Sequence, residues 1–218
     1  MNVLERLRRD RLMVLSRGIR KDVLMKGVGA IADAGVTVFE STFDHRRDDC
    51  IAENADKIAS LVKEFGGRMS IGAGTVLSVD EVRAAHDAGA AFIVSPDSDP
   101  DVIVETRRLG MVSIPGAMTP TEIKRAYAIG ADIVKLFPAD DLGYHYIQNL
   151  RGPMPHIPLV ATGGVNPDTI PEFLSRGILA VGTGITIFRP DLVAAEDYDG
   201  IKTLAAAHIS SIAKYLEH

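Results

Sequence analysis

Two ionisable side chains follow or interrupt apolar runs of the sequence in a way that predicts chemistry. Lys135 lies within the apolar run 133–138, and Glu40 directly follows residues 36–39. Burial disfavours a charged ammonium and lowers its pKa, so a buried lysine can present a neutral amine near neutral pH. Such an amine is a nucleophile that forms a Schiff base with a ketone. A carboxyl group beside it can move the protons of the reaction, so this pair suits carbon–carbon cleavage.

The sequence leaves other interpretations of these residues open. A lysine at a strand end can extend its ammonium into solvent or simply pair with a carboxylate. A metal-assisted lyase would use Glu40, Asp44 and His45 as ligands for Mg²⁺, Mn²⁺ or Zn²⁺. On a strand, however, His45 would point away from the other two, and the remaining histidines are scattered. We therefore expect a reaction that uses no metal and no cofactor.

Glycine clusters late in the sequence predict an anion-binding site. Gly163 and Gly164 follow Thr162 and open a helical pattern, and residues 182–184 read Gly-Thr-Gly. Exposed backbone N–H groups at a helix N-terminus attract phosphate, and glycine lets the anion approach closely. Arg17, after the first predicted strand, is a second candidate anchor. Tight turns alone would also explain either cluster, so a phosphate-binding barrel isomerase or a non-catalytic phosphate binder remains an alternative.

The elements that must position these residues alternate between strand and helix. Short apolar or β-branched runs, each followed by a helical pattern, recur eight times. The predicted strands are 12–16, 36–42, 69–74, 92–96, 111–116, 133–138, 158–163 and 179–184, and the clearest helical stretches are 50–65, 80–88, 119–129 and 167–176. Strands separated by helices pair in parallel, so the pattern predicts an α/β protein of the (β/α)8 TIM-barrel class.

Polar or glycine-rich residues end most of the predicted strands, which favours a closed barrel over an open doubly wound sheet. In a barrel these ends converge on one mouth, whereas in an open sheet only the switch point would be used. A short N-terminal helix that contains the basic stretch 5–11 precedes the first strand. We expect residues 1–218 to form a single barrel domain.

Composition excludes several classes of function. The net charge of -5 and the lack of a basic stripe with interleaved aromatics argue against nucleic acid as a partner. No apolar run reaches membrane-spanning length and no targeting segment is apparent, so no membrane partner is expected. The single cysteine, Cys50, cannot form an internal disulfide, which agrees with a reducing compartment. We expect a cytoplasmic protein whose partner is a small molecule.

The chain resembles the KDPG/KHG aldolase family (2-keto-3-deoxy-6-phosphogluconate and 4-hydroxy-2-oxoglutarate aldolases). These are class I aldolases, which cleave 2-keto-4-hydroxy acids to pyruvate and an aldehyde. The resemblance covers nearly the whole chain and rests on six motifs in order: FEST (39–42), IGAGTVL (71–77), IVSP (93–96), IPG (114–116), VKLFPA (134–139) and ATGGV (161–165).

This resemblance implies roles for individual residues. Lys135 would form the Schiff base and Glu40 would shuttle protons. Gly163 and Gly164 would help to bind a distal phosphate, and the enzyme would be a cytoplasmic homotrimer. The residues implied to shape the pyruvate pocket are Thr75, Pro96, Phe137 and Thr162.

Two positions depart from the family pattern. Many members have an arginine for the pyruvate carboxylate where this chain has Asp44, and a carboxylate cannot make that contact. Members that act on the galactonate-derived acid also lack this arginine, and Arg46 or Arg47 is the nearest substitute here. A family serine that meets the phosphate is replaced by Ile185 after Gly184, so the backbone N–H remains and the hydroxyl is lost. The aldehyde, its stereochemistry and its phosphorylation therefore stay open, with 2-keto-3-deoxy-6-phosphogalactonate or an unphosphorylated 2-keto acid as alternatives.

Overall fold

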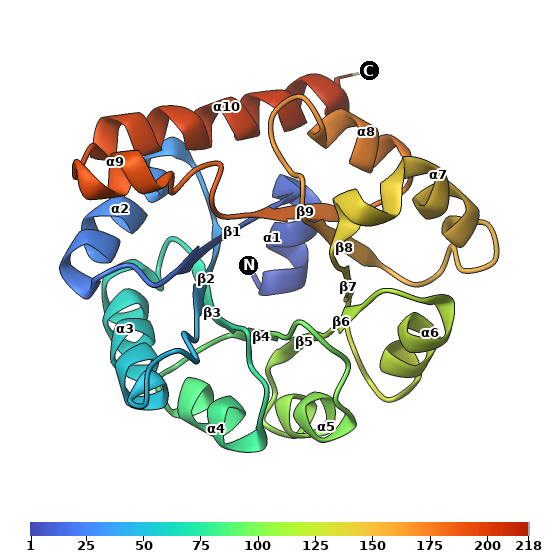
Figure 1. Cartoon of the computed structure of the whole chain (residues 1–218), viewed down its shortest axis with the longest axis horizontal. Coiled ribbons are helices and arrows are strands. Elements are labelled where there is room, and N and C mark those ends of the chain that lie inside the picture. The colour runs from blue at the N-terminus through green and yellow to red at the C-terminus, as the bar shows by residue number, and fades with distance from the viewer. Residues whose placement is uncertain (218) are drawn as a thin grey trace.

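The computed structural model describes residues 1–217, and His218, the last residue of the predicted domain, lies outside them. Strands and helices alternate around a ring (Figure 1). The strands are β1 (Leu12–Arg17), β2 (Val38–Thr42), β3 (Ser70–Gly74), β4 (Phe92–Val94), β5 (Val112–Ile114), β6 (Gly116–Ala117), β7 (Val134–Leu136), β8 (Leu159–Thr162) and β9 (Ala180–Thr183). The helices are α1 (Val3–Asp10), α2 (Lys21–Ala34), α3 (Cys50–Phe65), α4 (Val79–Asp87), α5 (Pro100–Arg108), α6 (Pro120–Ala128), α7 (Ala139–Arg151), α8 (Ile170–Ser175), α9 (Pro190–Ala194) and α10 (Tyr198–Leu216).

The strands form one parallel sheet that closes into a barrel. Their order is β5-β4-β3-β2-β1-β9-β8-β7-β6. The two outermost strands of this order, β5 and β6, are consecutive in the sequence. They are two halves of one barrel strand separated by Pro115, which has no N–H to donate to a ladder. Backbone bonds continue on both sides of the break, from Ser95 N to Ile114 O and from Lys135 N to Pro115 O. The predicted (β/α)8 barrel is thus confirmed.

Helix α1 closes the N-terminal end of the barrel. Figure 1 shows α1 within the ring of strands. The Asn2 side chain accepts a hydrogen bond from Glu5 N (2.9 Å) and caps the helix. Val3 and Leu7 are buried in the cluster that fills the barrel interior. The predicted N-terminal helix is confirmed, and it leaves the C-terminal ends of the strands as the open mouth.

The alternation of side chains along each strand decides what points into the barrel. On β2, Phe39 joins the outer core between strands and helices, so Glu40 points inward. On β7, Val134 and Leu136 belong to the outer core, and Lys135 between them points inward. The two ionisable residues therefore share the barrel interior.

The ring of helices is completed by the C-terminal segment. Helix α10 packs against α2 and α8, which joins the last helix to the first barrel unit. Within residues 1–217, no helix has the length and apolar character that crossing a bilayer requires.

Candidate active site

Lys135 is held in an apolar, nearly solvent-free position. The residue is 7% exposed, and its Nζ lies 4.6 Å from the centre of the Phe137 ring. Burial lowers the pKa of Lys135, Arg17 lowers it further, and Glu40 and Asp97 oppose the shift. No hydrogen bond within residues 1–217 contributes to this shift. The site therefore favours the neutral, nucleophilic amine more than water does.

Glu40 is the acid of the site and is also buried, at 3% exposure. Thr42 Oγ1 donates a hydrogen bond to its Oε1 (3.3 Å), while Oε2 is buried without a hydrogen-bond partner among residues 1–217. Burial raises the pKa of Glu40, against the opposing effects of Lys135, Thr42 and Arg17. A carboxyl group whose pKa is raised toward neutrality can both give and take a proton during turnover.

Gly74 creates the space that the Glu40 carboxyl group occupies. A Cβ atom at position 74 would overlap with Oε1 of Glu40. Because β2 and β3 pair so that Glu40 faces Gly72 and Thr42 faces Gly74, the carboxyl group lies over this glycine strand. The small residue at position 74 therefore determines where the acid sits.

We predict that Gly74→Ala lowers kcat by about 10- to 100-fold, because a displacement near 1 Å of a catalytic group costs this order of rate. Trapping of a pyruvate adduct with borohydride should persist, since the Lys135 position is unchanged. Gly67→Ala is the matched control, because a Cβ there meets no atom within 4 Å. Equal turnover of the two folded variants would show that Gly74 does not position Glu40.

Arg17 and Thr75 meet at the mouth of the barrel. One guanidinium nitrogen of Arg17 donates to Thr75 Oγ1 at 2.8 Å. Thr75 has a φ of +54°, a left-handed conformation that costs a β-branched residue energy and persists only where contacts enforce it. The ring Nε2 of His45 contacts the Thr75 carbonyl oxygen at 2.8 Å. Thr75 is therefore held by a side chain from the end of β1 and by one from the loop after β2.

A cavity of about 730 Å³ opens at the same mouth. Its lining includes six residues predicted to bind substrate: Arg17, Phe137, Thr162, Gly163, Gly164 and Gly184. Two further site residues contact residues of this lining. Lys135 Nζ lies over the ring of Phe137, and Thr75 is hydrogen-bonded to Arg17. Pro96 lies next to Gly116, the β6 partner of Lys135, since a Cβ at Gly116 would overlap with the Pro96 carbonyl.

Thr162 presents a second polar atom without a partner. Its Oγ1 is buried and accepts or donates no hydrogen bond within residues 1–217. Buried hydroxyl groups in proteins are almost always hydrogen-bonded. Gly182 gives it room, because a Cβ there would lie 2.8 Å from Thr162 Oγ1. The orphaned oxygens of Glu40 and Thr162 are suited to polar groups of a substrate.

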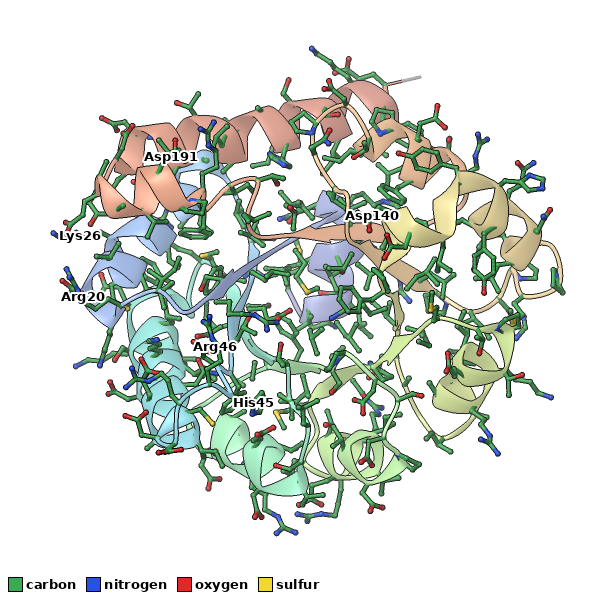
Figure 2. The ribbon with its side chains drawn as sticks, viewed as in Figure 1. Arg20, Lys26, His45, Arg46, Asp140 and Asp191 are labelled. Carbon is green, nitrogen blue, oxygen red and sulfur yellow. The ribbon has the colours of Figure 1, made fainter. Side chains whose placement is uncertain are left out.

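Gly163 and Gly164 adopt conformations that only glycine tolerates well, with φ of +108° and +67°. Asp140 packs against both, because a Cβ at position 163 would lie 2.5 Å from its Oδ1 (Figure 2). In the part of the chain that the structure describes, the backbone N–H groups of Gly163, Gly164, Gly184 and Ile185 donate to no protein acceptor. These N–H groups are therefore available to an anion, as the sequence predicted. The geometry of the turn by itself also requires the two glycines.

The set Glu40, Asp44 and His45 does not converge on one point. Asp44 is held by Arg46 through two hydrogen bonds of 2.7 Å, which keep the pKa of Asp44 at about 2. His45 instead approaches Glu81 and Cys50. Arg46 is thus paired with Asp44, and Arg47 is paired with Asp49 and Glu53. Neither arginine is therefore free to take the place of the arginine that many family members have at position 44.

Two contributors to the site were missed in the sequence. Asp97 follows Pro96 in the loop after β4 and raises the pKa of Lys135, and Thr42 donates a hydrogen bond to Glu40. The signal for Thr42 was its spacing of two residues from Glu40, which places both on the inner face of one strand. The signal for Asp97 was an acidic residue directly after an apolar strand.

The fold and the site together define a lyase of the class I aldolase type, in which a lysine forms a Schiff base with the substrate. The family model "KDPG and KHG aldolase" matches residues 3–204, and the chain belongs to this family.

Individual relatives agree with this assignment. The chain is 32% identical over 179 residues to 2-dehydro-3-deoxy-6-phosphogalactonate aldolase of Escherichia coli (strain K12), covering 82% of this chain and 84% of the relative. It is 35% identical over 153 residues to 2-dehydro-3-deoxy-phosphogluconate aldolase of Treponema pallidum (strain Nichols), covering 69% and 72%. A solved structure described as native KDPGal superposes with a TM-score of 0.86 at 30% identity, over 95% of this chain and 96% of that one.

Proposed function

We propose that Lys135 and Glu40 carry the aldolase reaction. The neutral Nζ of Lys135 attacks the C2 ketone of a 2-keto-4-hydroxy acid, and the carbinolamine loses water to form the imine. Glu40 takes the proton of the C4 hydroxyl as the C3–C4 bond breaks, and the bonding electrons move into the protonated imine to give a neutral enamine. After the aldehyde leaves, Glu40 returns a proton to C3 and water hydrolyses the imine to pyruvate and the free amine.

One observation carries this assignment: a buried lysine and a buried carboxyl group share the open end of the barrel, and each shifts the pKa of the other. Thr75, Pro96, Phe137 and Thr162 would surround the pyruvate half, with the free Thr162 hydroxyl available to its polar groups. The test is to add pyruvate and borohydride and to locate the reduced adduct by peptide mass spectrometry. An adduct on another lysine, or on none, contradicts the proposal.

For the other half of the substrate we propose 2-dehydro-3-deoxy-6-phosphogalactonate. Two relatives named for this substrate are 32% and 34% identical to the chain, over 82% and 89% of its length. The phosphate would meet Arg17 and the free N–H groups of Gly163, Gly164 and Gly184. Turnover of this compound should exceed that of the gluconate-derived epimer, and a reversed preference in kcat/KM would assign the gluconate substrate instead.

Ile185 supports an unphosphorylated 2-keto-4-hydroxy acid as a second candidate. It lines the cavity and is 71% exposed, so an apolar side chain stands where the family serine would meet the phosphate. A hydrogen bond to a charged group is worth roughly 1.5 to 3 kcal/mol, so its absence weakens phosphate binding.

We predict that Ile185→Ser raises kcat/KM for the phosphorylated substrate by about tenfold or more, because the new hydroxyl donates to the anion. Turnover of 4-hydroxy-2-oxoglutarate, which has no phosphate, should change little. Ile185→Ala separates the effect of the hydroxyl from that of removing bulk. If the two variants behave alike on both substrates, the distal group does not reach position 185.

The family resemblance also leads us to propose a homotrimer in the cytoplasm, with residues 1–218 as one barrel domain. The single cysteine, which is free, agrees with a reducing compartment. Sedimentation equilibrium would test the trimer, and a mass of one or two chains would contradict it.

A further inference from the structure

Three metal-binding side chains converge beside the mouth of the barrel, outside the site described above. His45 comes from the loop after β2, Cys50 is the first residue of α3, and Glu81 is in the first turn of α4. One ligand atom from each lies within 4.8 Å of the others. Figure 2 shows His45 at the rim beside α4. His45 and Cys50 belong to one connection, whereas Glu81 comes from a separate segment, so local sequence does not bring Glu81 to the other two.

The hydrogen bonds of His45 leave one ring nitrogen facing another electron-pair donor. A carbonyl oxygen can only accept, so the contact of Nε2 with Thr75 O places a hydrogen on Nε2. The other nitrogen, Nδ1, lies 3.5 Å from Oε1 of Glu81. In the neutral ring, Nδ1 presents a lone pair toward the carboxylate oxygen, so both atoms are available as donors to one cation. Cys50 brings its sulfur to within 4.8 Å of the ligand atoms of the other two residues.

Glu81 is the anchored member of the cluster. The residue is only 5% exposed, and its Oε2 accepts a hydrogen bond from Leu77 N (2.5 Å). The side chain is therefore fixed, with Oε1 directed toward His45. A buried carboxylate costs free energy unless a positive charge or hydrogen bonds compensate it. His45 and Cys50 are more exposed and can rotate toward a common ion.

We propose that His45 Nδ1, Cys50 Sγ and Glu81 Oε1 form a site for Zn²⁺, with water as the fourth ligand. Imidazole and thiolate favour zinc or cobalt over Mg²⁺ and Ca²⁺, which take oxygen ligands. Zinc bonds of about 2.0 to 2.3 Å place neighbouring donors roughly 3.5 Å apart. His45 and Glu81 are already at this spacing, and the donors that lie farther apart must approach by about 1 Å. The bond from Nε2–H to the Thr75 carbonyl is the outer contact that orients a zinc-bound imidazole.

The site would clamp two loops of the barrel mouth. It joins the loop after β2 to the start of α3 and to the Glu81 side chain, which already holds Leu77 after β3. His45 passes the constraint to Thr75, and Thr75 contacts Arg17. The ion would thus stabilise the folded state and the position of Thr75, and the imine chemistry of Lys135 would proceed without it.

The test is a Co²⁺ titration of the full chain after treatment with a chelator. Cys50 is the only cysteine, so a thiolate-to-cobalt charge-transfer band reports on this site alone. We expect saturation at one equivalent per chain, displacement by Zn²⁺, and a Tm that rises with added Zn²⁺. Cys50→Ser should abolish the band and weaken Zn²⁺ binding more than about tenfold.

His86→Gln is the matched control, because His86 also lies in α4 but pairs with Asp87 at 3.1 Å away from the cluster. Its cobalt band and Zn²⁺ affinity should equal those of the parent chain. Lack of the charge-transfer band, or equal Zn²⁺ affinity in Cys50→Ser, overturns the proposal. Pyruvate trapping on Lys135 in the presence of chelator tests the aldolase assignment separately, so failure of one leaves the other standing.

Discussion

Lys135→Ala is expected to lower kcat/KM by on the order of 10⁴-fold or more and to eliminate the borohydride-trapped pyruvate adduct. The amine is the covalent nucleophile, and removing it removes the whole imine pathway rather than one contribution to it. Arg17 cannot substitute, because a guanidinium stays protonated and does not attack a carbonyl. Steady-state turnover and intact-mass spectrometry after trapping measure the two effects independently.

Two further variants make this result interpretable. Lys135→Met keeps an unbranched side chain of similar length in the buried position, so its loss of activity cannot come from an unfilled space. Lys124→Ala removes an exposed lysine of α6 and should leave both turnover and the adduct unchanged. An adduct of normal yield in folded Lys135→Ala would move the Schiff base to another residue.

The strand pattern predicted the barrel well, and its errors have local causes. All eight predicted strands overlap observed ones, but the fifth is divided at Pro115 into β5 and β6. The last predicted helix, 167–176, begins later, at Ile170, because Asn166 Oδ1 accepts hydrogen bonds from Asp168 N and Thr169 N. Asparagine side chains that bond to their own backbone form turns in place of the first helical residues.

Tertiary features were less accessible from the sequence. The short N-terminal helix was predicted, but its place inside the barrel depends on Val3 and Leu7 meeting side chains from several distant strands. The prediction for Glu40 and Lys135 rested on their places near strand ends at one barrel mouth, and the period of two along a strand explains why both point inward. The space that Gly74 leaves for Glu40 and the contact of His45 with Thr75 join residues from different segments. No single-segment pattern encodes such contacts.

Glu40→Gln is expected to lower kcat by about 10²- to 10⁴-fold, the usual contribution of a positioned acid–base group. The amide can hold the shape of the site and can donate or accept hydrogen bonds, but it cannot take the proton of the C4 hydroxyl or return one to C3. Trapping of the pyruvate adduct should fall much less, because Lys135 remains. Glu64→Gln, an exposed position of α3, is the control for loss of a carboxylate.

The pH dependence of adduct formation gives this variant a second, independent result. Trapping needs the neutral amine, so its rate rises with pH as Lys135 loses its proton. Burial lowers the pKa of Lys135, whereas the negative charge of Glu40 raises it. Glutamine removes only the second effect, so the midpoint of the trapping profile should move to lower pH than in the parent enzyme. A midpoint that stays in place or moves upward would mean that the negative charge of Glu40 does not act on Lys135.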